Sequence, residues 1–84
     1  MTNPAAQTSA GPAYGEGRDA YNKGQTIEQC LAGSYYANQA RMIAGGFHVA
    51  TGYAEAAKTG GADAATCAGY ITAGHNYQRP RKGA

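Results

Sequence analysis

Apolar side chains recur at helical steps from residue 26 to residue 58, a stretch that contains no proline. One stripe of such residues consists of Ile27, Leu31, Tyr35, Met42, Val49 and Tyr53. A second stripe, well round the helix from the first, consists of Tyr36, Ile43, Phe47, Ala50 and Ala54. This spacing predicts a helix, and a helix that is apolar over so much of its circumference normally packs on more than one side. We therefore expect one long helix over about 26–58 that has several neighbours.

Local signals mark the ends of this helix and the start of a second one. TIEQ, residues 26–29, is a capping box in which Thr26 and Gln29 exchange side-chain-to-backbone hydrogen bonds. KTGGAD, residues 58–63, is typical of a helix end, with a glycine for the left-handed position and Asp63 to cap the next helix. Pro80 prevents that next helix from continuing into the tail. The pattern predicts a shorter antiparallel helix over about 63–75, so that residues 26–76 form a helical hairpin.

Gly45 and Gly46 stand together in the middle of the predicted long helix, in the stretch ARMIAGGFHVATGY. A glycine pair costs a helix about 2 kcal/mol relative to two alanines. Both apolar stripes nevertheless keep their phase across the pair, and no Pro, Asn, Asp or Ser accompanies it as a turn would favour. We expect a continuous helix that has no side chains at these two positions, so that a neighbouring backbone can approach. The alternative is a chain that reverses at the glycines and forms three short helices.

Both ends of the chain lack a helical or strand period. Residues 1–25 scatter Pro4, Pro12 and four glycines among small and polar residues. Such a segment cannot bury enough apolar area to offset the entropy of ordering itself. We expect an extended, irregular arm over 1–25 that orders on a partner, and an irregular basic tail over 77–84. The predicted fold class is therefore all-α, a helical hairpin between two irregular ends.

Composition narrows the classes of function. The 84 residues are 43% hydrophobic, but more than half of that share is alanine, which removes little area from water when it is buried. A chain this small with so few large apolar side chains is not expected to be stable alone. The net charge of +2 with 14% charged residues is too weak for a nucleic-acid-binding face. We also expect cytoplasmic synthesis without a signal peptide, and no membrane span, because no basic and apolar leader and no long apolar window occur.

A continuous helix would keep the two cysteines apart. Cys67 would lie opposite about Ala54, and Cys30 would lie about 36 Å further along, whereas a disulfide needs Cα atoms within about 7 Å. Cys30 and Cys67 are therefore either separate buried thiols or candidates for disulfides between chains. His48 and His75 have no H-x₃-H pattern, CxxC or carboxylate cluster beside them. We expect no catalytic residue, no cofactor and no metal site.

Seven tyrosines run through the arm, the helices and the tail, in a chain otherwise built largely from alanine and glycine. Tyrosine is large, stiff and polar at its tip, which suits it to interfaces between proteins. We expect contact energy to be concentrated in the tyrosines and the few other large apolar side chains. The predicted interface residues are Tyr14, Tyr21, Tyr35, Tyr36, Met42, Phe47, Tyr53, Tyr70 and Tyr77.

These features together indicate a small, non-enzymatic structural subunit of a large assembly, with larger structural proteins in many copies as its partners. A virus or phage particle is our first hypothesis, with the chain as a minor capsid, cement or tail component located in the virion. Cysteines that cannot pair internally and arms that order on neighbours both suit such a particle. The alternatives are an accessory subunit of a multisubunit enzyme or photosynthetic complex, a self-assembling helical filament subunit, and a small redox or metal enzyme that uses Cys67 and His75.

Overall fold

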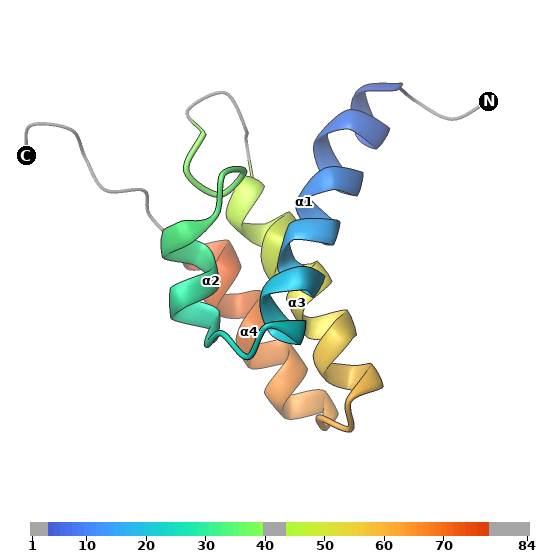
Figure 1. Ribbon diagram of the computed structural model, residues 1–84, viewed down its shortest axis with the longest axis vertical. Coiled ribbons are helices and arrows are strands. Elements are labelled where there is room, and N and C mark those ends of the chain that lie inside the picture. Colours follow the sequence, from blue (N-terminus) through green and yellow to red (C-terminus); the bar gives the residue numbers. More distant parts are fainter. Residues whose placement is uncertain (1–3, 40–43, 78–84) are drawn as a thin grey trace, which may run out of the picture.

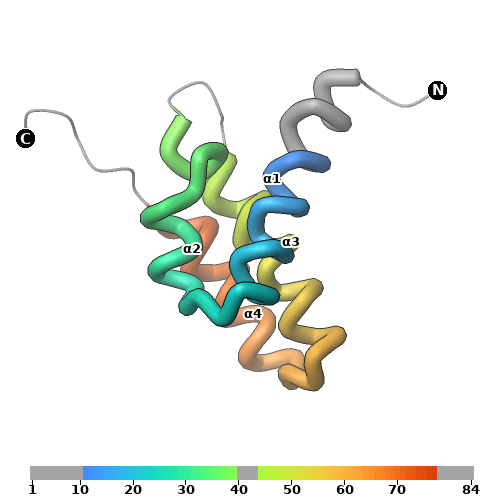
Figure 2. The backbone as a smooth tube through the Cα atoms, in the orientation of Figure 1, coloured from blue at the N-terminus to red at the C-terminus, as the bar shows by residue number. Residues whose placement is uncertain are grey.

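Three helices pack around a fourth, α3, in the computed structural model, which describes residues 4–39 and 44–77, with side chains from residue 11 onward (Figure 1). The helices are α1 (Pro4–Asn22), α2 (Ile27–Gly33), α3 (Gly45–Thr59) and α4 (Ala64–Asn76). Helix α3 packs against both α1, which crosses it, and α4, whereas the short α2 follows α1 and makes smaller contacts with α1, α3 and α4 (Figure 2). No strand occurs in the described ranges. The all-α class predicted from the sequence is confirmed.

The local signals for helix ends are confirmed as well. The Thr26 hydroxyl accepts from the Gln29 amide at 3.1 Å, and the Gln29 side chain accepts from the Thr26 amide at 2.9 Å. Helix α3 ends at Thr59, and Gly61 follows with φ of +105°, a left-handed conformation that glycine adopts without strain. The Asp63 carboxylate accepts from the Thr66 amide at 2.8 Å and caps α4. Helices α3 and α4 therefore form the expected antiparallel hairpin.

The continuous helix over 26–58 is wrong. Helix α2 ends at Gly33, Ser34 is extended, residues 35–38 form a turn, and α3 begins at Gly45. A side chain pairs with backbone carbonyl groups that a continued helix would have paired with amides. The side-chain amide of Asn38 donates to the carbonyl oxygens of Leu31 at 2.9 Å and Ser34 at 2.6 Å. The glycine pair thus starts a helix instead of lying inside one. Met42 lies outside the described residues.

The extended arm predicted over 1–25 is wrong for residues 4–22, which form α1, with Pro12 inside the helix. Tertiary packing explains the helix, because α1 crosses α3 at very close range. A Cβ at Gly17 would overlap the carbonyl oxygen of Val49, and a Cβ at Gly52 would overlap the carbonyl oxygen of Tyr14. The basic tail after Tyr77 lies outside the described residues.

The core lies where α1 and α2 meet the α3–α4 hairpin, and it is thin. Val49 is the largest side chain that is fully buried, and alanines make up more than half of the buried hydrophobic residues. These residues are Ala13, Ala20, Ile27, Cys30, Leu31, Ala37, Val49, Ala50, Tyr53, Ala54 and Ala57. Burial of alanine stabilises a fold much less than burial of leucine or phenylalanine does.

Gly46 permits a second close approach between backbones. A Cβ at Gly46 would lie 2.8 Å from the carbonyl oxygen of Gly74, and a Cβ at Gly74 would overlap Gly46 and the Ala50 side chain. The neighbour that the glycine pair admits is therefore α4 of the same chain.

Candidate interaction surface

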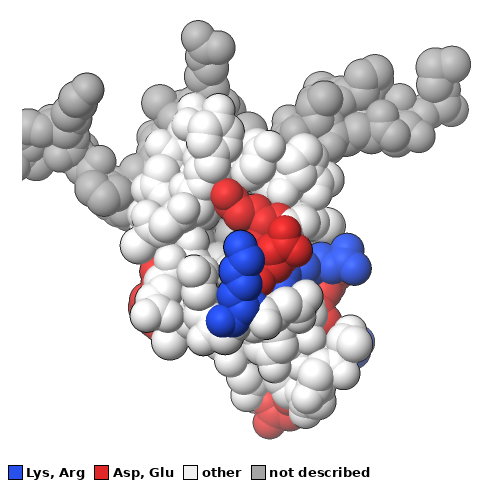
Figure 3. Space-filling view, in the orientation of Figure 1, with Lys and Arg blue, Asp and Glu red and all other residues white. Residues whose placement is uncertain are grey.

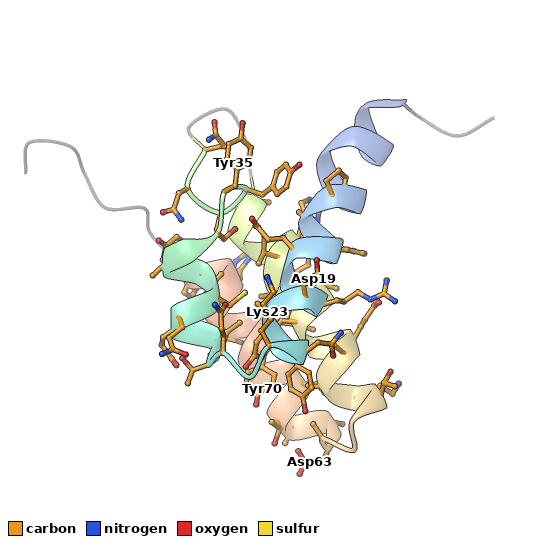
Figure 4. The ribbon with its side chains drawn as sticks, in the orientation of Figure 1. Asp19, Lys23, Tyr35, Asp63 and Tyr70 are labelled. Carbon is orange, nitrogen blue, oxygen red and sulfur yellow. The ribbon has the colours of Figure 1, made fainter. Side chains whose placement is uncertain are left out.

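Tyr53 belongs to the core of the chain. It is 4% exposed, and its hydroxyl donates to the Gln25 carbonyl oxygen at 2.5 Å. Its ring meets Tyr21 at 5.3 Å and Tyr70 at 4.9 Å between centroids, both edge to face, which is a favoured aromatic geometry. These three predicted interface residues thus join α1, α3 and α4 internally, and Figure 4 shows Tyr70 on α4. Tyr53 is a core residue and not part of an exposed interface.

Tyr14 and Phe47 pack against the two histidines. Ring centroids lie 6.0 Å apart for Tyr14 and His48, 5.6 Å for Phe47 and His48, and 6.2 Å for Phe47 and His75. The Nδ1 atom of His48 is buried and has no hydrogen-bond partner among the described residues. In that part of the chain, no group of three or more His, Cys, Asp or Glu side chains is placed to hold a metal ion. The histidines lie beside aromatic rings at the junction of α1, α3 and α4.

Tyr35 and Tyr36 belong to the turn after α2, and Tyr77 contacts it from the end of α4. Tyr35 is 61% exposed, the most prominent exposed large hydrophobic side chain of the described structure, and its ring packs edge to face on Tyr36 at 5.0 Å (Figure 4). The Tyr77 hydroxyl donates to the Asn38 side-chain oxygen at 2.7 Å, which ties the turn to the end of α4. Tyr35 is therefore the predicted interface tyrosine best placed to meet another protein.

Glu16 of α1 organises this turn, and sequence reasoning missed it. Its carboxylate accepts hydrogen bonds from the Ser34 hydroxyl and from the amides of Tyr35 at 2.9 Å and Tyr36 at 3.3 Å. The Ser34 hydroxyl in turn accepts from the Ala37 amide at 2.8 Å. Ser and Asn near a helix end do signal a turn, but nothing local points to a carboxylate that lies eighteen residues earlier in the chain.

The two cysteines occupy different environments, and both are free thiols. Cys30 is 3% exposed, and burial, with a smaller effect from the charge of Glu16, raises its pKa from 9.0 to about 11. Cys67 is half-buried on α4, and its thiol donates to the Ala54 carbonyl oxygen at 3.5 Å. A thiolate is the reactive form of cysteine, and burial disfavours the thiolate of Cys30. Cys67 is therefore the better candidate of the two for a bond to another chain.

A groove of about 360 Å³ runs between α3 and α4, and we call it the α3–α4 groove. Its lining is mostly small and apolar, and two exposed charged residues of opposite sign, Glu55 and Lys58, border it. Neither Glu55 nor Lys58 forms an ion pair with another described residue. Glu55 also lines a neighbouring groove, which Arg18 of α1 borders. The lining consists of Thr51, Ala54, Glu55, Lys58, Ala62, Ala64, Cys67, Ala68 and Ile71.

Helix α4 also exposes a smooth, uncharged strip beside the groove. Its sequence contains no Asp, Glu, Lys or Arg, and Gly74 is its only buried residue. Ala65, Gly69 and Thr72 are exposed, and a Cβ at Gly69 would have no neighbour within 4 Å. We call these three residues the outer face of α4. Small side chains let another backbone approach closely, and the lack of charge lowers the cost of removing water.

Three charged side chains of the described structure lie together on another face. Glu16, Asp19 and Lys23 line a groove of about 220 Å³ between α1 and α2, and Figure 3 shows red and blue side chains together on this face, with uncharged surface around them. All five acidic residues of the chain but only three of its seven basic residues are in the described part.

None of the described helices has the length and apolar character needed to cross a membrane.

No protein-family model matches the sequence, and comparison with curated proteins and with solved structures finds no similar one.

Proposed function

We propose that this chain is a non-enzymatic structural subunit that is held in a larger, multi-copy assembly through the outer face of α4. The observation that carries the proposal is an exposed helix without charged side chains: α4 buries only Gly74, yet presents alanine, glycine and threonine to its surroundings. On a protein that functions alone, such a face would normally carry charged residues that favour solubility. The strip is suited to close contact with a helix of another subunit.

The thin core supports the same proposal. With Val49 as the largest fully buried side chain and alanine at more than half of the buried hydrophobic positions, the fold buries little apolar area per residue. A partner that binds only the folded state adds to its stability by mass action. A subunit that stays in its assembly therefore needs less core of its own than a free protein does.

The assembly that we propose is a virus or phage particle, with the chain as a minor capsid, cement or tail component. Two features support this choice: both cysteines are free, with Cys67 at a surface groove, and Tyr35 is exposed. Residues 4–22 form α1 within the chain and are not an arm that orders on neighbours, so the N-terminal segment does not support this choice. The choice of a particle therefore rests on Tyr35 and the free cysteines, together with the uncharged outer face of α4.

Gly69→Arg tests the proposed docking surface. The substitution replaces a helical glycine with a better helix former in open space, so the isolated chain should fold at least as well as the wild type. The long charged side chain should nevertheless block close helix contact, and we expect at least about a tenfold loss of the chain from purified particles. Incorporation is measured by co-sedimentation and quantitative immunoblotting of particles from cells that express the variant.

Gly33→Arg is the matched control, because Gly33 is also an exposed helical glycine with open space around it. We expect its incorporation to equal that of the wild type. Normal incorporation of Gly69→Arg, with an unchanged circular dichroism spectrum, would overturn the role of the outer face of α4.

A further inference from the structure

The α3–α4 groove has a border that is complementary to itself. Glu55 and Lys58 lie one helical turn apart on α3, both are exposed, and both line the groove. Their charges are opposite, and neither is used in an ion pair within the described residues. In a contact between two identical surfaces related by a two-fold axis, each residue i meets residue j of the other copy, and j meets i. A pair of opposite charges beside an apolar groove meets this condition.

From this self-complementary border, we propose that two copies of the chain pack face to face across their α3–α4 grooves. The two α3 helices run antiparallel, so that Glu55 of each copy faces Lys58 of the other. The axis of symmetry passes between these two charges. The pairing makes two ion pairs from one arrangement of residues, and it adds a partner to the proposed function without using the outer face of α4.

The groove lining supplies the apolar contact between the copies. Ala64 and Ala68 are small and exposed, so the helix axes of the two copies can approach to about 8–10 Å, the normal spacing of packed helices. Ile71 is only half-buried within one copy and gains cover in the pair. Two α3–α4 hairpins stacked in this way form a four-helix arrangement, a common way to enclose an apolar seam.

Charge exchange tests the pairing directly. In the full-length purified chain, Lys58→Glu places four like charges around the axis, and Glu55→Lys does the same with the opposite sign. Because both symmetry-related contacts turn repulsive, we expect either substitution to weaken dimerisation by at least about tenfold at low salt. The double variant Glu55→Lys/Lys58→Glu restores both ion pairs and should return the dissociation constant to near the wild-type value. Sedimentation equilibrium from micromolar to millimolar concentrations measures each constant.

Lys23→Glu is the control, because it changes the net charge by the same amount at an exposed lysine outside the groove. It should leave the dissociation constant unchanged, and circular dichroism checks that each variant is folded. A wild-type chain that stays monomeric at every concentration overturns the pairing, as does a double variant that remains as weak as the single ones. Either result leaves the proposed role of the outer face of α4 intact, because that role is tested by Gly69→Arg in particles.

Discussion

At the scale of single residues, Glu16 decides where α2 ends. Its carboxylate accepts three hydrogen bonds from residues 34–36, where α2 has ended and the turn begins, and two of the donors are backbone amides. Hydrogen bonds to an ionised acceptor are roughly twice as strong as neutral ones. The helix predicted over this stretch would have paired these amides with carbonyl oxygens of its preceding turn. The carboxylate from α1 offers stronger acceptors, and the chain turns.

Glu16→Gln should therefore loosen the turn. The amide keeps one acceptor oxygen but directs an NH₂ group at the remaining donors, so we expect a loss of about 1–3 kcal/mol in the free energy of unfolding. The amides of Tyr35 and Tyr36 should also exchange faster with solvent. Urea denaturation and hydrogen exchange measured by NMR provide the two values. Asp19→Asn, at an exposed position of the same helix, serves as control, and equal effects of the two substitutions would contradict the assigned role of Glu16.

At the scale of elements, glycines allow α1 and α3 to cross with their backbones in contact. Gly17 faces Val49 and Tyr53 of α3, while Gly52 faces Tyr14 of α1, so each helix has a glycine where the other comes closest. A side chain at either position would have to push the two backbones apart. The crossing is the main contact of α1 with the rest of the chain, and therefore the place where the fold tolerates least change.

Gly17→Ala should destabilise the protein although alanine is the better helix former. The new methyl group has no room, and we expect a loss of about 1–3 kcal/mol in the free energy of unfolding, as for other overpacked contacts. Gly15→Ala, two residues earlier in α1, has nothing within 4 Å and should gain up to about 1 kcal/mol. Chemical denaturation of both variants measures the difference. The same sign of change for both substitutions would disprove close packing at Gly17.

Local signals in the sequence were sufficient for some elements and not for others. Thr26, Gly61 and Asp63 act through neighbours within a few residues, so the ends of the helices around them could be predicted. Helix α1 could not, because Gly11, Gly15 and Gly17 lower helix propensity, while the contact that requires Gly17 lies more than thirty residues away in α3. Gly17 therefore lowers the local helix propensity of α1, but it also allows the close contact with α3 that stabilises this helix.

The candidate surface was predictable to a similar extent. Tyrosine abundance pointed to contact residues, but it could not separate the buried Tyr53 from the exposed Tyr35, because burial depends on which helices meet. The outer face of α4 contains no large side chain and gave no signal of that kind. Its significance appears only when the structure shows which side of α4 is left uncovered.

At the scale of the whole molecule, stability should fall in alkaline solution. The pKa of Cys30 rises from 9.0 to about 11 in the folded state, mainly through burial, so the folded protein holds this proton more tightly than the unfolded chain does. The resulting stabilisation is fully present below pH 9.0 and is lost as the pH rises toward about 11. Burial also raises the pKa of Tyr53 from 10.0, which adds a loss of the same sign at higher pH.

Urea denaturation at a series of pH values checks this expectation. The free energy of unfolding should be level from neutral pH to about pH 9 and should decrease beyond it. Cys30→Ala should lower stability at neutral pH, because it removes a buried side chain, and should make the alkaline decrease shallower. A wild-type profile that stays level to pH 11 would show that the Cys30 thiol titrates normally in the folded state.

The interlocked glycines Gly46 and Gly74 constrain how this chain can evolve. A shift of α4 by one residue turns it by about 100°, which would bring a side chain to the point where α3 leaves room only for hydrogen. Insertions in the linker at residues 60–63 are therefore tolerable only if they loop out and leave both glycines opposite each other. In diverging descendants, we expect the linker to vary in length, while any change at one glycine is accompanied by a change at the other. Such a paired history would identify distant relatives of this chain even after its surfaces had changed completely.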